Sequence, residues 1–225
     1  MIAETPLTLS VDAGVELEAR LAVPREPRAG FAMCHPHPLY GGDMDNPVVV
    51  RAVEVAVALD VATMRFNFRG VGASTGTHGG GGAEQRDLGE ALDRLREAVP
   101  ADAPVIAAGY SFGSLVAAHV AARGRIDALA LIAPPLGIGD DRRLPGFPAT
   151  RPVLVVVGSA DEYCPPSAIE RLRAELRDAR IDVVDGANHF FFGTLFPLGE
   201  TLRGWLEATL AALRARQAGR RGGAG

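Results

Sequence analysis

Short runs of purely apolar residues constrain the fold of this chain more than any other feature. Such runs occur at residues 30–34 (GFAMC), 105–109 (VIAAG), 128–133 (ALALIA) and 153–157 (VLVVV). They lack the alternation of apolar and polar residues that marks a strand with one wet face, so they are typical of strands buried on both faces. Longer segments with helical spacing follow them along the chain. This order predicts an open, doubly wound, mostly parallel sheet with helices on both faces.

The beginning of the chain follows a different pattern. LTLSVDA and VELEARLAV both alternate between apolar and polar residues, and the short DAG segment between them can form a turn. Period-two alternation on both sides of a turn predicts an antiparallel strand pair. We therefore expect the α/β sheet to carry an antiparallel pair at its N-terminal end.

Length and composition bound the function as well as the fold. The 225 residues are 48% hydrophobic, which suits one domain, expected over residues 1–217, with a flexible basic and glycine-rich tail over 218–225. The net charge of −4 argues against a nucleic-acid partner. The two cysteines are too few for a disulfide framework. Neither a signal peptide nor an apolar run of about 20 residues is found, so we expect a cytoplasmic protein without a membrane partner.

Three reactive residue types stand where expected strands end. Ser111 follows the run at 105–109, Asp161 follows the run at 153–157, and His189 follows IDVVDG. Because the carboxyl ends of parallel strands meet at one edge of the sheet, ligands bind there in open α/β folds. A serine hydroxyl is a weak nucleophile until a histidine removes its proton, and an acid holds that histidine in the required tautomer. The three residues therefore predict a nucleophilic site.

Five motifs in a fixed order resemble those of the α/β-hydrolase superfamily, in particular small lidless bacterial serine esterases of the dienelactone-hydrolase-like branch. They are G-Y-S-F-G at 109–113, G-S-A-D-E-Y-C-P at 158–165, G-A-N-H-F at 186–190, N-F-R-G-V-G-A-S at 67–74, and H-P-H-P followed by two glycines at 35–42. The order serine, acid, histidine is the one found on that fold. In the fourth motif Asn67 stands where the family usually has Asp.

The resemblance implies a triad of Ser111, Asp161 and His189 and an oxyanion hole of backbone N–H groups. One donor should be Phe112, which follows the nucleophile. The other should come from the loop after the 30–34 run. Proline has no N–H group, so His37 is the candidate there, with Leu39 or Tyr40 as alternatives.

Other readings of the same residues remain open. Ser111 could merely cap a helix, and Glu162 could replace Asp161 as the acid. His35 and His37 form an H-x-H pattern that ligates metals elsewhere, but no further ligand motif accompanies it, so we expect no metal. The glycines at 79–82 lack the G-K-[ST] ending of a phosphate-binding loop and suggest a flexible loop near the site entrance.

The expected pocket involves aromatic residues. Most of the phenylalanines between 190 and 196 are expected in the core, while Phe190, with Tyr40 and Tyr110, could line an acyl pocket. The link between the expected strands at 128–133 and 153–157 is short and rich in Pro and Gly. It therefore predicts an open site without a cap domain.

The sequence as a whole favours a serine hydrolase, specifically a carboxylesterase acting on small or short-acyl esters through an acyl-enzyme and without a cofactor. A thioesterase, an amidase or a peptidase could use the same triad, and a non-catalytic binding scaffold could keep the fold. The expected partner is a small-molecule ester, and the chain could be a monomer or a homodimer.

Overall fold

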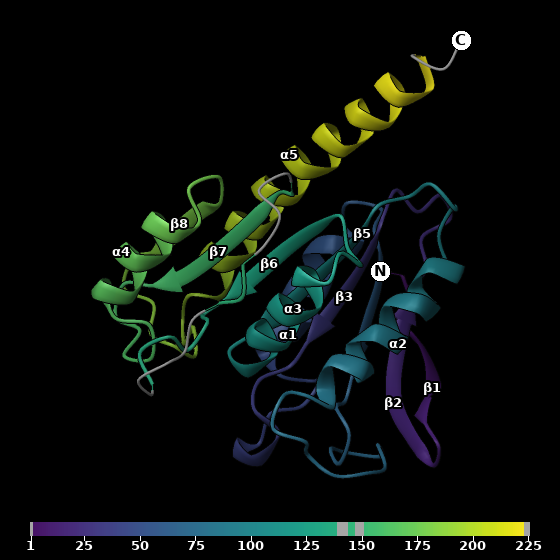
Figure 1. Cartoon of the computed structure of the whole chain (residues 1–225), viewed down its shortest axis with the longest axis horizontal. Coiled ribbons are helices and arrows are strands. Elements are labelled where there is room, and N and C mark those ends of the chain that lie inside the picture. Colours follow the sequence, from purple (N-terminus) through teal and green to yellow (C-terminus); the bar gives the residue numbers. More distant parts are fainter. Residues whose placement is uncertain (1, 139–143, 147–150, 223–225) are drawn as a thin grey trace.

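A single twisted sheet runs through the centre of the molecule (Figure 1). The computed structural model describes residues 2–138, 144–146 and 151–222. Within these residues the sheet has eight strands in the order β1-β2-β4-β3-β5-β6-β7-β8. The strands are β1 (Thr5–Asp12), β2 (Val15–Ala22), β3 (Gly30–Cys34), β4 (Ala62–Phe66), β5 (Val105–Tyr110), β6 (Ala128–Ile132), β7 (Val153–Gly158) and β8 (Arg180–Val184).

Strand direction follows the two sequence patterns. β1 pairs with β2 and β2 with β4 in antiparallel fashion, while β4, β3, β5, β6, β7 and β8 run parallel to one another. All residues of β3, β4, β5, β6 and β7 are buried, whereas β1 and β2 alternate in part. The predicted parallel sheet with an antiparallel N-terminal pair is confirmed.

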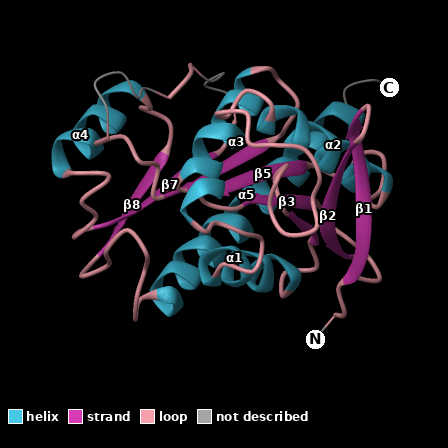
Figure 2. Ribbon diagram, turned by 90° about the horizontal axis from the view of Figure 1, so that it is seen from below, coloured by secondary structure: helices cyan, strands magenta, loops and turns pink. Residues whose placement is uncertain are grey.

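Helices cover both faces of the sheet (Figure 2). They are α1 (Pro47–Val57), α2 (Glu84–Glu97), α3 (Phe112–Ala122), α4 (Pro166–Glu175) and α5 (Leu195–Gly222), with a short 3₁₀ helix at Pro38–Tyr40. One apolar core joins α1 and α5 to one face, and a second joins α2, α3 and α4 to the other. The doubly wound architecture is therefore confirmed.

Local signals set the helix ends. The Asn46 side chain accepts a hydrogen bond from the Val48 N–H at 3.0 Å, and Pro47 occupies the first helical position of α1. Gly124 follows α3 with φ +89°, a conformation that glycine adopts without strain. The three valines at the start of α1 therefore did not produce a strand, because the start signal and the length favour a helix.

Two connections bear on the expected domain plan. In the part of the β6–β7 link that the structure describes there is no helix, in agreement with the absence of a cap domain. α5 continues to Gly222 and its last turns extend away from the sheet (Figure 1), whereas the sequence suggested a flexible tail from residue 218. Residues 218–222 are Ala-Gly-Arg-Arg-Gly, so alanine and arginine favour the added turn while the two glycines oppose it.

Candidate active site

Ser111 lies on a sharp turn between β5 and α3. Its φ of +53° is unusual for a residue with a side chain, and such strain concentrates at functional positions. A Cβ at Gly109 would lie 2.1 Å from the Gly113 carbonyl oxygen, and one at Gly113 would lie 2.5 Å from the His35 carbonyl oxygen. Only glycine fits at both positions. The G-x-S-x-G spacing is thus a steric requirement of this turn.

The three candidate side chains meet at the carboxyl edge of the sheet. His189 Nε2 lies 3.0 Å from Ser111 Oγ, and His189 Nδ1 lies 3.0 Å from both carboxylate oxygens of Asp161. Asp161 and His189 are 4% and 6% exposed, so the contact between them is shielded from water. With the Nδ1 proton directed to the carboxylate, Nε2 is left to accept the serine proton.

Backbone N–H groups hold the loop that carries Asp161 (the acid loop) in place. Asp161 Oδ1 accepts hydrogen bonds from the Tyr163 N–H at 2.8 Å and the Cys164 N–H at 3.2 Å. The Ala160 N–H donates to the Ala187 carbonyl at 2.9 Å. This hydrogen bond joins the acid loop to the loop that carries His189 (the histidine loop). Glu162, the alternative acid, is exposed. The geometry therefore favours Asp161.

Tyr110 connects the serine turn with the histidine loop. Its side chain is 2% exposed, and its hydroxyl donates a hydrogen bond to the His189 carbonyl oxygen at 3.0 Å. Burial and the nearby Asp161 charge raise the pKa of this phenol above its usual value, so it remains a donor. Tyr110 also borders the cavity described below, but its hydroxyl is used for positioning.

The candidate donors of the oxyanion hole are backbone N–H groups at the start of α3 and in the loop after β3. Phe112 is the first residue of α3, at the end of the helix where backbone N–H groups favour negative charge. In the opposite loop, the Tyr40 N–H donates to the His37 carbonyl at 3.1 Å and the Leu39 N–H to His37 Nδ1 at 3.2 Å. These two N–H groups are occupied within their own turn, so neither Leu39 nor Tyr40 is favoured as the second donor.

His35 acts as a support for the same loop. It is fully buried, its Nδ1 lies 2.6 Å from the Pro36 carbonyl oxygen, and its Nε2 accepts from the Phe68 N–H at 3.0 Å. Burial lowers its pKa to about 4, so the ring is neutral at physiological pH. Both ring nitrogens are engaged. No group of three or more potential metal-binding side chains occurs among the described residues.

The loop after β4 is held by polar contacts to β2. Asn67 Oδ1 accepts from the Met44 N–H at 2.8 Å, and Asn67 Nδ2 donates to Glu18 Oε2, also at 2.8 Å. The same Glu18 oxygen accepts from the Ala73 N–H at 3.0 Å. An aspartate at position 67 could not donate to Glu18, which explains how this chain accommodates Asn where the family pattern has Asp.

A buried carboxylate holds the glycine-rich segment (residues 79–82) in place. Glu84, which is fully buried, accepts from the N–H groups of Gly79 and Gly81, both at 2.7 Å. The His78 ring at its start lies 4.9 Å from the His37 ring and 5.4 Å from the Phe112 ring. The expected position of this loop beside the site agrees with these contacts.

A cavity of about 530 Å³ opens in front of Ser111 and His189. Tyr40, Tyr110 and Phe190 line it, together with His37, Phe112 and Tyr163. Its volume lies within the range of ordinary small-molecule sites. The predicted pocket residues are thus brought together with the triad.

The phenylalanines after His189 do not behave as expected. Only Phe191 is buried, whereas Phe190, Phe192 and Phe196 are 47%, 75% and 70% exposed. The prediction that most of them pack in the core is wrong. Phe191 adopts a φ of +53° in a tight turn, so it points into the core while its neighbours project outward.

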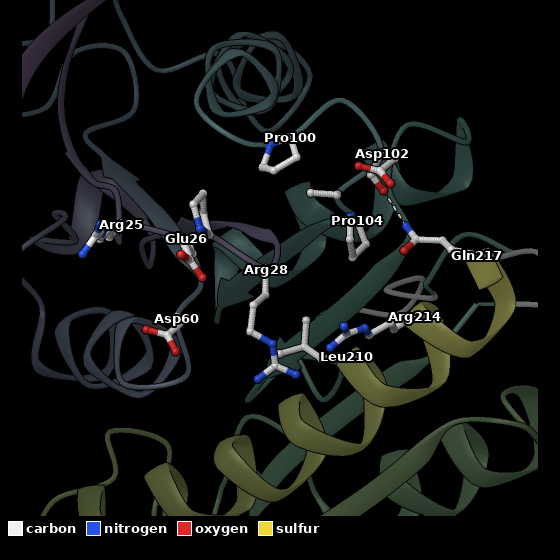
Figure 3. A pocket seen from close by; sticks show the side chains of 12 residues that line it. Arg25, Glu26, Arg28, Asp60, Pro100, Asp102, Pro104, Leu210, Arg214 and Gln217 are labelled. Carbon is white, nitrogen blue, oxygen red and sulfur yellow. Dashed lines mark hydrogen bonds between the residues drawn. The ribbon is translucent and has the colours of Figure 1, made fainter. Parts of the chain in front are cut away.

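A larger hollow, of about 860 Å³, lies at the opposite end of the sheet (Figure 3). Its walls include Arg25, Arg28 and Asp60 together with Leu210 and Arg214 from α5. The residues that the structure describes in its lining include no serine, cysteine or histidine. Its size alone therefore does not make it a reaction site.

Tyr163 was missed by sequence reasoning. Its ring lies 4.5 Å from that of His189 and forms part of the cavity wall. Its place two residues after Asp161 was the available signal. Cys164, beside it, is buried, and burial raises its pKa to about 12, so its thiol is protonated and inert.

Comparison with known proteins agrees with the fold and the open site. A sequence model of the alpha/beta hydrolase domain matches residues 37–215. The structure resembles an alpha-beta serine hydrolase homologue from Coxiella burnetii, with 31% identity, a TM-score of 0.81, and coverage of 90% of this chain and 97% of the other. A serine hydrolase without lid from Xanthomonas campestris is also 31% identical, with a TM-score of 0.80 over 91% and 94% of the two chains.

The chain therefore belongs to the α/β hydrolase family, and one of its structural neighbours in that family is a serine hydrolase without lid. An uncharacterised protein of Rickettsia prowazekii is 33% identical over 184 residues, which is 78% of this chain and 77% of that protein. Family membership and these neighbours support a hydrolytic function.

None of the helices in the described part of the chain has the length and apolarity needed to cross a membrane.

Proposed function

We propose that this protein is a serine esterase that hydrolyses small or short-acyl carboxylic esters through an acyl-enzyme. The observation that carries the proposal is the pair of 3.0 Å contacts that His189 makes, through Nε2 to Ser111 Oγ and through Nδ1 to Asp161. A cavity of about 530 Å³ gives a small ester access to this serine. The serine hydrolase without lid from Xanthomonas campestris supports an open site of this kind.

The reaction proceeds in two steps. Ser111 Oγ attacks the ester carbonyl while His189 Nε2 takes its proton, and the tetrahedral oxyanion accepts hydrogen bonds from the Phe112 and His37 N–H groups. The carbon–alcohol oxygen bond then breaks, and His189 returns the proton to the leaving alcohol. Water repeats the sequence on the acyl-serine and releases the acid. Asp161 stabilises the imidazolium in both steps.

The identity of the nucleophile can be tested with a fluorophosphonate probe. We expect one covalent label on the protein, lost in Ser111→Ala and retained in Ser167→Ala, which changes an exposed serine on α4. Hydrolysis of p-nitrophenyl acetate should fall by a factor of at least 10³ in Ser111→Ala. Undiminished labelling of Ser111→Ala would exclude Ser111 as the nucleophile.

The triad alone does not define the leaving group. Rates on p-nitrophenyl esters, acyl-CoA thioesters and peptide amides compare the esterase with the thioesterase, amidase and peptidase alternatives. We expect the highest kcat/KM on esters. An intact protein that reacts with neither probe nor ester would instead support the binding-scaffold alternative.

A further inference from the structure

The cavity beside Ser111 has walls built largely from rings. Phe112 and Tyr163 are packed into the wall, but Tyr40 and Phe190 are 87% and 47% exposed. The Phe190 ring contacts His189 edge to face at 5.5 Å and is stacked on the exposed Phe192 at 5.4 Å with an interplanar angle of 22°. Aromatic surface is therefore continuous from the imidazole to the cavity rim.

Exposed rings at a reaction site are suited to an aromatic ligand. Burying ring surface removes apolar area from water, and ring pairs gain additional free energy from offset-stacked or edge-to-face contacts. A saturated ring of the same size supplies the first contribution but not the second. Tyr40 rests on the His37 ring at 4.8 Å, so its exposed surface is presented at a defined place beside the oxyanion loop.

The charge of the cavity points in the same direction. Among the described residues that line it there is no lysine, arginine, aspartate or glutamate. The polar side chains there are Asn46, Ser111, the tyrosines and the imidazoles of His37 and His189. A charged group entering such a site loses hydration without gaining a counter-ion.

We propose that the substrate is an ester that carries an uncharged aromatic ring, and that this ring packs against Tyr40 and Phe190. The inference rests on the proposed serine esterase activity and adds the substrate class to it. Tyr40 and Phe190 are thereby specificity-determining residues.

Matched esters test the preference. Methyl 3-phenylpropanoate and methyl 3-cyclohexylpropanoate differ only in the aromaticity of a ring remote from the carbonyl, and benzyl acetate and cyclohexylmethyl acetate form the same pair on the alcohol side. We expect kcat/KM to favour the phenyl member of at least one pair by about 2- to 12-fold. A 4-carboxylate on the phenyl ring should lower kcat/KM by about 10-fold or more. If kcat/KM were equal for the two members of both pairs, or higher for the cyclohexyl member in both, the proposal would be overturned.

Variants assign the preference to the two rings. In Phe190→Leu and Tyr40→Leu we expect the phenyl-to-cyclohexyl ratio to fall toward one. Phe196→Leu is the matched control, because Phe196 is 70% exposed, does not line the cavity and lies against Arg51 at 5.8 Å. A ratio of rates on the same protein cancels any general loss of activity. A ratio unchanged in both cavity variants would contradict the assignment.

The two proposals fail in different ways. Hydrolysis of p-nitrophenyl acetate and labelling of Ser111 without any phenyl preference would overturn the substrate class and leave the serine mechanism intact. Absence of both hydrolysis and labelling would overturn the two together.

Discussion

Tyr110 links the residues on either side of the proton transfer. It immediately precedes Ser111, the proposed nucleophile, and its hydroxyl donates to the backbone carbonyl of His189, the proposed base. A displacement of the imidazole by even 1 Å is costly to a reaction that depends on aligned groups. The hydrogen bond therefore serves to position the base.

Tyr110→Phe removes that bond without changing the ring. We expect the free energy of unfolding to fall by about 1 kcal/mol, because the buried His189 carbonyl loses its donor. We also expect kcat to fall several-fold with little change in KM, since the ring contact with substrate is retained. Urea unfolding and ester kinetics measure the two effects. Unchanged kcat would show that the His189 loop holds its position without the hydroxyl.

Gly158 brings the acid and histidine loops together. A Cβ at this position would lie 2.1 Å from the Ala187 carbonyl oxygen. We expect Gly158→Ala to destabilise the protein by about 2–3 kcal/mol and to reduce activity strongly, because the loops must separate.

Gly204→Ala is the control for that variant. Gly204 lies within α5, and a Cβ there would meet no atom within 4 Å. It should stabilise the protein by about 0.5–1 kcal/mol through helix propensity. Equal unfolding midpoints for the two variants would show that the close approach at Gly158 carries no cost.

At the scale of elements, the loop between β4 and α2 is held against β2 by side chains from both. Asn67 and Glu18 form a pair in which one amide donates and one carboxylate accepts. A second hydrogen bond to the Glu18 carboxylate, donated by the Ala73 N–H, holds the next turn of the loop. We expect the position of residues 67–73 of this loop to depend on this anchorage.

Asn67→Asp tests the anchorage. The variant places two carboxylates within hydrogen-bonding distance of each other, so we expect a loss of about 2–3 kcal/mol in unfolding free energy at pH 7. The double variant Asn67→Asp with Glu18→Gln restores a donor–acceptor pair and should recover most of that loss. Thermal unfolding of the single and double variants measures the coupling, and additive losses would contradict it.

At the scale of the whole molecule, His35 couples stability to pH. Burial lowers its pKa in the folded protein to about 4, from its usual value of 6.5. Between these values the unfolded chain binds more protons than the folded one, so stability is lost as the pH falls. The shift corresponds to about 3 kcal/mol at full protonation.

Chemical unfolding at pH 7, 5.5 and 4 measures this effect. We expect most of the loss between pH 6.5 and pH 4, and a smaller slope in His35→Gln than in the native chain. His119→Gln, at an exposed position of α3, should retain the native slope. Parallel slopes in the native chain and His35→Gln would assign the pH dependence to other groups.

The layers of the fold and the order of the site residues could be predicted from the amino-acid sequence. Strands formed by apolar runs such as 153–157 carry apolar side chains on both faces. Both faces must be buried, and helices on the two sides of the sheet bury them. Ser111, Asp161 and His189 could be placed at one edge since parallel strands end there together. These are local consequences of composition and chain direction.

The neighbours that each side chain contacts depend on the three-dimensional arrangement of distant segments. The Tyr110 hydroxyl donates to the His189 carbonyl, 79 residues further along the chain. Asn67 suits the position where the family pattern has Asp because Glu18, 49 residues away in sequence, accepts its amide hydrogen. Phe190 and Phe191 are identical adjacent residues, yet one borders the cavity and the other lies in the core. The sequence could not separate them, since the direction of a loop side chain depends on backbone torsions that are set by contacts with distant segments.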